Sequence, residues 1–315
     1  MPEMKATRDG FGEALLELGR ENKKIVVLSG DLEDSTRAEY FKKEFPERFF
    51  NLGIAEQDVL GTAVGMSMDG LIPFVCSFAV FLTNRAYDIL RISVCYNDRN
   101  VKLIGSHAGL TVGPDGATAQ CLEDFAITRV LPNLKVICPA DAVEAKKATR
   151  MMAEVRGPAY MRLSRPPFPI ITKDSDEFIL GRANVMREGR DITVIACGLM
   201  VYEALQAAEI LKKENIETRV INMHTIKPID REIIIKSAQE TGAIVTAEEH
   251  QINGGLGSAV AEVLARNFPV LIEMVAVNDT FGESGESEEL LQKYHLKDID
   301  IVDAVKRVIA RKKKG

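Results

Sequence analysis

FFNLGIAEQDVLGTAVGMSMDGLIPFVCSFAVFLTN, at residues 49–84, holds one apolar helix, one strand and the start of a second helix, in the pattern of an α/β protein. The first predicted helix covers 54–69 and begins close to Glu56. We expect the Glu56 carboxylate near the helix N-terminus, where the helix dipole and backbone N–H groups favour an anion while apolar surroundings oppose it. Glutamates at helix starts are more often exposed to water, so Glu56 alone does not define a site.

Two phenylalanines follow the predicted strand 73–79. Phe78 and Phe81 are three residues apart at the entrance to a helix predicted over 80–96, so both rings are expected on one side. Such a pair is usually part of a hydrophobic core. Near a carboxylate such as Glu56, the same pair predicts a pocket for a flat heteroaromatic ring, with the phenylalanines against its face and the carboxylate at its polar edge.

A second stretch, VKLIGSHAGLTVGPDGATAQCLED at 101–124, predicts a strand over 101–107 and then a glycine-rich loop that carries His107 and Asp115. Glycine permits backbone conformations and close ligand approach that a Cβ forbids. Histidine can donate to hydroxyl or phosphate oxygens near neutral pH. A histidine after a strand is often only structural, but the nearby aspartate and the composition of the loop favour a site here.

Strand-like and helix-like segments alternate along the whole chain. The strands are short and apolar, which is typical of a mostly parallel sheet covered by helices on both faces. We therefore expect an α/β fold with two doubly wound domains. The remaining strands are predicted at 24–31, 135–140, 159–164, 192–198, 218–225, 242–250 and 270–277, and the remaining helices at 7–22, 121–130, 141–155, 199–214, 230–240 and 255–267.

The proline-rich segment RPPFPIITKDS at 165–175 interrupts this alternation and predicts a domain boundary. We expect a first domain over 1–165, a linker over 166–185 and a second domain over 186–315, which are ordinary domain sizes. In the second domain GGLGS lacks the full dinucleotide-binding fingerprint, so it is interpreted as a close packing turn.

Composition narrows the class of protein. With 40 basic against 46 acidic residues the net charge is −6, which argues against a general nucleic-acid surface. The five cysteines are an odd number without a CxxC pair, so they are interpreted as reduced core residues of a cytoplasmic protein. No segment has the apolar length of a signal peptide or a membrane span, so we expect no membrane association.

Five motifs occur in order along the chain: GIAEQ, PFVCSFAVF, GSHAGLTVGPDGAT, ICPAD and MRLSRP. In sequence and spacing they resemble the transketolase family, and the likeness covers essentially the whole chain. The chain resembles the pyrimidine-binding domain of transketolase followed by the transketolase C-terminal domain. Several separate motifs in the family's order are more specific than any single glycine-rich match.

This resemblance implies a thiamine diphosphate site. Glu56 corresponds to the glutamate that hydrogen-bonds N1′ of the cofactor's pyrimidine, which favours the imino form of the 4′-amino group and so activates the thiazolium carbon. The residues that the resemblance places around the pyrimidine are Asp31, Leu32, Phe78 and Phe81. It implies no metal ligand in this chain.

The same resemblance implies a site for sugar phosphates. Arg8, Ser35 and Arg165 fall at the family's positions for the phosphate dianion, which guanidinium groups bind well. His107 resembles the catalytic histidine at the substrate channel. Asp115 resembles the aspartate that binds the C2 hydroxyl of the substrate.

The sequence departs from the family pattern at two positions. The family often has a second histidine where this chain has Ala119, and the neighbouring Gln120 is a candidate to replace it. A third aromatic residue beyond Phe81 is also common, and Asn84 stands there instead. These two positions affect contacts to the donor sugar and to the rim of the pyrimidine.

One family element is absent. SGDL at 29–32 does not complete the GDG motif that, with a downstream Asn, holds the diphosphate and its metal, and no other segment of the sequence qualifies. We therefore expect the C-terminal subunit of a split transketolase, working with an N-terminal subunit that binds the diphosphate and a divalent metal such as Mg²⁺. The expected assembly is a heterotetramer, with self-association through both domains of this chain.

The activity implied is transfer of a two-carbon ketol unit from a ketose phosphate to an aldose phosphate, as in the pentose phosphate pathway. Three alternatives stay open: a deoxyxylulose phosphate synthase, the beta subunit of a 2-oxoacid dehydrogenase, and a non-catalytic regulatory relative. The match of His107, Asp115 and Arg165 to sugar-phosphate positions argues against the dehydrogenase.

Overall fold

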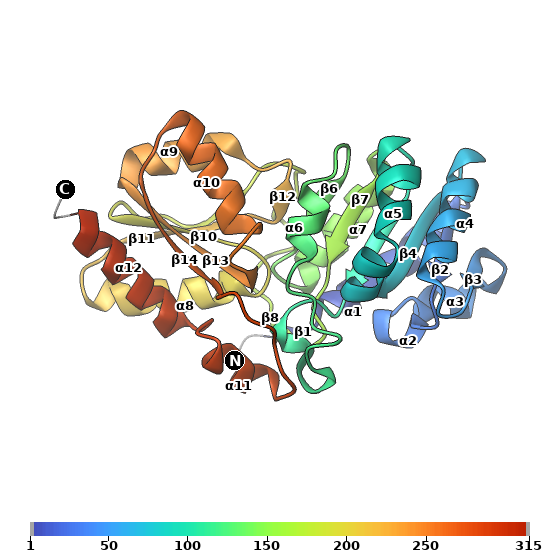
Figure 1. Cartoon of the computed structure of the whole chain (residues 1–315), viewed down its shortest axis with the longest axis horizontal. Coiled ribbons are helices and arrows are strands. Elements are labelled where there is room, and N and C mark those ends of the chain that lie inside the picture. Colours follow the sequence, from blue (N-terminus) through green and yellow to red (C-terminus); the bar gives the residue numbers. More distant parts are fainter. Residues whose placement is uncertain (1–2, 313–315) are drawn as a thin grey trace.

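The computed structural model describes residues 3–312 and contains two large sheets that lie side by side along the long axis of the molecule (Figure 1), together with a small sheet of two strands. Helices cover both faces of each sheet, as the alternating sequence pattern predicts. Most neighbouring strands in the two large sheets are parallel, which confirms the predicted fold class.

The first part runs from β1 to β8. Its elements are β1 (Met4–Lys5), α1 (Thr7–Glu21), β2 (Ile25–Ser29), α2 (Glu33–Thr36), α3 (Glu39–Glu44), the 3₁₀ turn η1 (Pro46–Arg48), β3 (Phe49–Asn51), α4 (Glu56–Met68), β4 (Ile72–Phe78), the π-helical η2 (Phe81–Arg85), α5 (Tyr87–Ile89), the π-helical η3 (Leu90–Tyr96), β5 (Lys102–Ser106), the 3₁₀ segment η4 (Leu110–Asp115), α6 (Asp124–Arg129), β6 (Lys135–Ile137), α7 (Ala142–Glu154), β7 (Ala159–Arg162) and β8 (Phe168–Pro169).

The first sheet has the strand order β12-β6-β7-β5-β4-β2-β3. Along β2, Ile25 and Val27 belong to the core beneath α1 and α7, while Val26 and Leu28 belong to the core beneath α4. This alternation follows from the two-residue period of a strand, which points successive side chains to opposite faces. Because the first four residues of β2, Ile25 to Leu28, are apolar, this strand is suited to being covered on both faces.

The second part runs from β9 to α12. Its elements are β9 (Asn184–Arg187), β10 (Ile192–Ala196), α8 (Met200–Lys213), β11 (Thr218–Asn222), β12 (Thr225–Lys227), α9 (Arg231–Thr241), β13 (Ala243–Gln251), α10 (Leu256–Asn267), β14 (Leu271–Val277), α11 (Ser287–Lys293) and α12 (Asp298–Lys312). Its sheet has the order β14-β13-β10-β11-β9.

Two features connect the parts in ways that the sequence pattern did not predict. β12 belongs by sequence to the second part, but it pairs antiparallel with β6 at the edge of the first sheet. The segment predicted as a linker, 166–185, contains β8, which pairs with β1, and it overlaps the start of β9. The domain boundaries therefore stay a prediction, because strands from both sides of them share a sheet.

The two parts also share one hydrophobic core. A single cluster contains Val136 and Cys138 from the first part together with Ile195 and Cys197 from the second. All five cysteines of the chain are buried free thiols, as the sequence composition predicts. The junction is therefore packed like the interior of a domain, and it fixes how the two sheets sit against each other.

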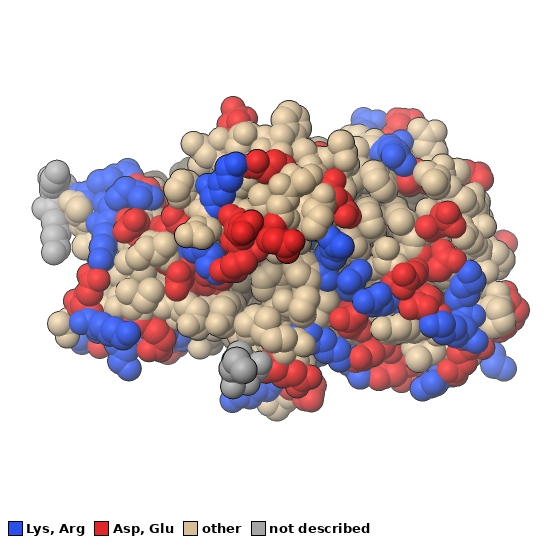
Figure 2. All heavy atoms as spheres, turned by 90° about the horizontal axis from the view of Figure 1, so that it is seen from below, with Lys and Arg blue, Asp and Glu red and all other residues tan. Residues whose placement is uncertain are grey.

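Surface charge is mixed on the face seen from below. Lys and Arg side chains are interspersed with Asp and Glu there (Figure 2). Ion pairs at the surface of the molecule include the one between Lys306 and Glu214. Among residues 3–312, none of the helices combines the length and apolar character that crossing a membrane requires.

A buried glutamate lies at the junction. Glu144 of α7 accepts hydrogen bonds from the Ala140 N–H at 2.7 Å and from the Asn222 amide of β11 at 2.8 Å. Burial raises the pKa of Glu144 to about 7, although these hydrogen bonds oppose the shift. Since a glutamate in the unfolded chain titrates near 4.5, the folded chain binds this proton more tightly, and folding stability decreases as pH rises from about 4.5 to about 7.

We predict that Glu144→Gln increases the free energy of unfolding at pH 8 by about 1 to 3 kcal/mol and changes it little at pH 5. The amide keeps an acceptor for Asn222 and can also donate to Asn222 Oδ1, which has no hydrogen-bond partner among the described residues. Urea unfolding at the two pH values measures the effect. Glu154→Gln, an exposed change on the same helix, is the control. Equal effects at both pH values would contradict the assignment.

Candidate functional site

The carboxyl ends of three strands meet at one edge of the first sheet. β2, β4 and β5 are adjacent and parallel in that sheet. Asp31 and Leu32 follow β2, Phe78 ends β4, and His107 follows β5. Ligands bind at this edge of open parallel sheets, so the fold brings these predicted site residues to one place although they are far apart in the sequence.

Glu56 is the first residue of α4, and its side chain is only 4% exposed. Arg85 Nη1 donates a hydrogen bond to Glu56 Oε1 at 3.1 Å. The unpaired N–H groups of the first helical turn and the helix dipole both favour a negative charge at this place. The Glu56 carboxylate is thus buried. It differs in this from most glutamates at helix starts, which are exposed to water.

Phe78 lies in a layer of flat groups. Its ring centroid is 5.6 Å from that of Phe81 and 3.9 Å from that of His107, and both pairs are within 17° of parallel. The guanidinium carbon of Arg85 lies over the Phe81 ring, 4.1 Å from its centroid. The layer therefore extends from the partner of Glu56 to the imidazole of His107.

Arg85 is a site residue that the sequence analysis did not identify. It lies four residues after Phe81 on the predicted helix 80–96, and this spacing puts two side chains on the same face of a helix. Its planar guanidinium stacks on Phe81 and donates to Glu56 at the same time. Phe81 and Glu56 together can therefore hold a flat group that carries N–H donors.

His107 has a constrained conformation. Its φ is 56°, in the left-handed region that non-glycine residues seldom occupy. Its Nδ1 is 2.9 Å from the hydroxyl of Ser106, and Arg8 Nη1 is 3.5 Å from its Nε2. Burial and the positive charges of Arg8 and Arg165 lower the pKa of His107 to about 3. The imidazole is therefore neutral at physiological pH, and it can present a hydrogen-bond donor without adding a charge.

Arginines cluster beside His107. Arg8 Nη1 donates to the carbonyl oxygen of Ser35 at 2.8 Å, so Ser35 contacts the cluster through its backbone rather than its hydroxyl. Arg8 Nε is buried and has no hydrogen-bond partner among the described residues. The charges of Arg37 and Arg165 act on Arg8 and lower its pKa further after burial, the largest cause. Excess positive charge with an unsatisfied donor is what a phosphate group would neutralise.

Arg37 is a second residue near the site that the sequence did not predict. Its φ of 65° ends α2 in the left-handed conformation. Its Nε donates to Asp9 at 2.7 Å, which ties α2 to α1 beside Arg8. No sequence signal pointed to it, because its place next to Arg8 depends on how the two helices pack.

Arg165 and Asp115 close the other side of the cluster. Arg165 Nη1 donates to the Val112 carbonyl at 2.6 Å and lies 3.7 Å from Asp115 Oδ1. The side chains of Arg165 and Asp115 are 35% and 38% exposed, so both are open to a ligand from solvent. The structure thus brings together all five residues predicted to bind the sugar phosphate.

The two departures from the family pattern have different environments. Gln120 is buried, and its Nε2 donates to the carbonyls of Leu110 at 3.1 Å and Glu283 at 2.8 Å. Its amide donor therefore bonds to the protein backbone in this structure, while its Oε1 has no partner among the described residues, and a role for Gln120 in place of a histidine stays a prediction. Asn84 donates to Glu123 Oε1 at 2.9 Å, which makes it part of a side-chain pair rather than an aromatic wall.

Two family models together match most of the chain. The transketolase pyrimidine-binding domain matches residues 3–169, and the transketolase C-terminal domain matches residues 181–301. The chain belongs to the transketolase family. A Methanocaldococcus jannaschii protein named as a transketolase C-terminal section is 46% identical over 313 residues, which cover 98% of this chain and 97% of that protein.

Two further relatives match nearly end to end. The 6-deoxy-6-sulfo-D-fructose transketolase subunit SqwH of a Clostridium species is 41% identical over 97% of this chain and 95% of its own length. A solved structure described as a split gene transketolase, an inactive beta4 tetramer, is 50% identical, has a TM-score of 0.91, and covers 97% of this chain and 98% of that one. These three relatives are named as a C-terminal section, a subunit and a split-gene transketolase.

Transketolases depend on thiamine diphosphate and a divalent metal. The chain's own residues fit the pyrimidine part of that cofactor, because Glu56 and Phe81 already bind one flat N–H donor, the guanidinium of Arg85. Within residues 3–312, no three His, Cys, Asp or Glu side chains are grouped as ligands for a metal ion. The roles of the individual site residues stay predictions.

We predict that His107 does not titrate between pH 5 and 8. An unfolded histidine titrates near 6.5, and the folded value is about 3 because burial and the arginine cluster oppose protonation. The side-chain proton and carbon shifts of His107 should therefore stay constant over this range in NMR spectra, with His107→Gln used to assign the signal. By linkage, protonation favours unfolding, so folding stability falls as pH decreases from 6.5 toward 3. A midpoint between 5 and 8 would show that the ring is more exposed than described.

Proposed function

We propose that this chain is the C-terminal subunit of a two-chain transketolase that transfers a two-carbon ketol unit from a ketose phosphate to an aldose phosphate. One arrangement carries the proposal: the buried Glu56 carboxylate lies next to a layer of flat side chains that ends at His107, where the arginine cluster begins. A ring-binding place and an anion-binding place thus adjoin, as a cofactor ring and a sugar phosphate would require.

In this proposal each residue has a role toward the cofactor. Glu56 holds the polar edge of the pyrimidine, and Phe78 and Phe81 pack against the ring, while Asp31 and Leu32 line the same sheet edge. When bound, thiamine diphosphate supplies the electron sink for breaking and forming the carbon–carbon bond. The partner subunit holds the diphosphate and a divalent metal such as Mg²⁺.

The substrate roles follow from charge and exposure. Arg8 and Arg165 bind the phosphate end of the sugar, and Ser35 supports them because its carbonyl accepts from Arg8 and orients that guanidinium. Neutral His107 donates a hydrogen bond to a substrate oxygen, and Asp115 accepts one from a substrate hydroxyl. Because His107 is neutral, it adds no positive charge that would attract the phosphate away from the arginines.

The assembly that we propose is a cytoplasmic heterotetramer with two copies of each subunit. Gly61 and Gly65 are one helical turn apart on α4, and, apart from the backbone of α4 itself and the adjoining residues, no atom of the described residues lies within 4 Å of where their Cβ atoms would be. Such a small-residue face lets another helix approach closely, which supports self-association through the first domain. A related split-gene transketolase is described as inactive in its beta4 form, which supports a requirement for the second subunit. We propose a first domain over 1–165, a linker over 166–185 and a second domain over 186–315.

We predict that the purified chain alone has no ketol transferase activity and gains it when mixed with an N-terminal subunit, thiamine diphosphate and Mg²⁺. The assay follows fructose 6-phosphate as donor and ribose 5-phosphate as acceptor, with pyruvate decarboxylation measured in parallel. Glu56→Gln in the mixture should lower kcat by about 100- to 10,000-fold, the range for loss of a positioned acid–base group. Its thermal unfolding should stay close to that of the wild type.

Three outcomes would contradict the proposal. Activity of the chain alone would remove the need for a partner. Pyruvate decarboxylation without ketol transfer would favour the dehydrogenase alternative. A fully active Glu56→Gln mixture would indicate a regulatory relative whose chemistry does not involve this carboxylate.

A further inference from the structure

The second part of the chain contacts the loop that follows His107. Thr111, four residues after His107, donates its backbone N–H to Glu249 Oε1 of β13 at 2.6 Å. The carbonyl of Thr111 accepts from the Ser287 hydroxyl of α11 at 2.9 Å. Both backbone polar groups of one loop residue are therefore bound by side chains of the second part.

The approach of Glu249 to this loop depends on a glycine. Gly109 has a φ of 88°, and a Cβ at this residue would overlap the Glu249 carboxylate. Only glycine adopts this positive φ readily and also lacks the Cβ that would collide with the carboxylate. The loop and the carboxylate are thus fitted to each other at Gly109, two residues after His107.

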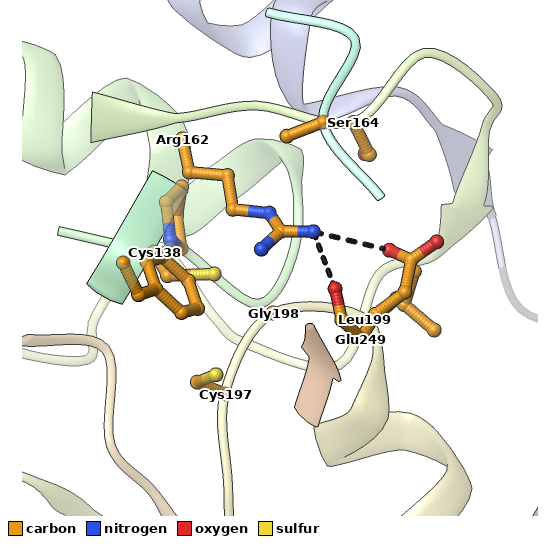
Figure 3. Close-up of a pocket in the computed structure, with 10 residues that line it drawn as sticks. Cys138, Arg162, Ser164, Cys197, Gly198, Leu199 and Glu249 are labelled. Carbon is orange, nitrogen blue, oxygen red and sulfur yellow. Dashed lines mark hydrogen bonds and ion pairs between the residues drawn. The ribbon is translucent and has the colours of Figure 1, made fainter. Parts of the chain in front are cut away.

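Glu249 is itself held rigidly (Figure 3). Arg162 of β7 donates through Nη2 to the Glu249 carbonyl at 2.6 Å, and the same atom lies 3.8 Å from Glu249 Oε2. Arg162 Nη1 donates to Asp124 of α6 at 3.1 Å. All three side chains are buried, so the anchor for Thr111 has little freedom to move.

The tethered loop carries the predicted substrate groups. It begins at His107 and reaches Asp115, and between them Val112 accepts the hydrogen bond from Arg165. At its far end, Gln120 binds the carbonyl of Glu283 in the second part. The second part thus holds this stretch of chain at two places, Thr111 and Gln120, which restricts how far the loop can move on its own.

We infer that Glu249 is a positioning residue for the substrate site: by accepting the Thr111 N–H it fixes the loop that carries His107 and Asp115. This gives the C-terminal domain a role in substrate binding without any contact of its own to substrate. The inference rests on the proposed function, because the loop must bind a sugar phosphate for its position to affect catalysis.

The first test measures the loop itself, in the chain alone. Glu249→Ala should speed hydrogen exchange of the Thr111 amide by at least about tenfold, because this N–H loses its only acceptor among the described residues. Gly109→Ala disturbs the same contact from the loop side and keeps the partners of Arg162, Asp124 and the Glu249 carbonyl. It should therefore also speed exchange of the Thr111 amide. Glu249→Gln keeps an acceptor oxygen and should restore slow exchange.

The second test uses the assembled two-chain enzyme. In Glu249→Ala, kcat/KM for fructose 6-phosphate should fall about 10- to 100-fold, chiefly through KM, because a misplacement on the order of 1 Å can have an effect of this size. The Kd for thiamine diphosphate should change less than about threefold, since the cofactor residues lie on other elements. Glu249→Gln should recover most of the loss.

The matched control is Glu203→Ala. Glu203 is another buried glutamate of the second part that accepts a backbone N–H, from Asp298 at 2.9 Å, and it does not contact the loop. It should lower stability without changing Thr111 exchange or the donor KM.

The outcomes separate the two ideas. An active wild type with an unchanged donor KM in Glu249→Ala and Gly109→Ala would overturn the inference, as would a Glu249→Gln variant no better than Glu249→Ala. An assembled wild type without ketol transfer would instead overturn the proposed function, whatever the exchange data show.

Discussion

The buried guanidinium of Arg162 joins the halves of this molecule. Burial opposes its charge, but Asp124 and Glu249 outweigh that effect and raise the pKa of Arg162, so it stays a cation inside the junction. One carboxylate comes from the first part and the other from the second, and Tyr160 donates to Asp124 at 2.8 Å. The buried guanidinium bonds to both parts at once, through the Asp124 carboxylate and the Glu249 carbonyl, and its removal would leave both buried carboxylates without their cation.

The same constraint reaches the site. The carboxyl ends of β2, β4 and β5 give the site its floor, and the loop after β5 gives it a wall that is bonded to β13 and α11. In many α/β proteins a rigid sheet carries site loops that are free at the surface. Here the loop after β5 is instead bonded to the second part of the chain. The second part supplies none of the predicted ligand contacts, but it binds the loop that carries His107 and Asp115.

The electrostatics of the site follow a simple division. Glu56 is a buried anion at a helix start, paired with a half-exposed arginine, and the arginine cluster is a separate positive region beyond Phe78. His107 lies between them, and burial keeps it neutral. An acidic end suits the polar edge of a heterocycle and a basic end suits a phosphate, so these residues can orient two different groups in one direction.

The sequence by itself determined the α/β class, nine of the twelve strands of the two large sheets, and the family, because apolar periodicity and local motifs are properties of neighbouring residues. It did not predict β3, β9 or β12 as strands of their own. It also named Glu56, Phe78, Phe81 and His107, each of which lies within or next to such a motif. Only the tertiary structure decided the pairing of Arg85 with Glu56 and the position of Arg37 near Arg8. It also decided that Gln120 bonds to the backbone and that β12 joins the first sheet. The hydrogen bond from Thr111 to Glu249 likewise depends on how the two parts pack. These contacts join residues whose separation in sequence carries no periodic signal, and packing and burial alone bring them together.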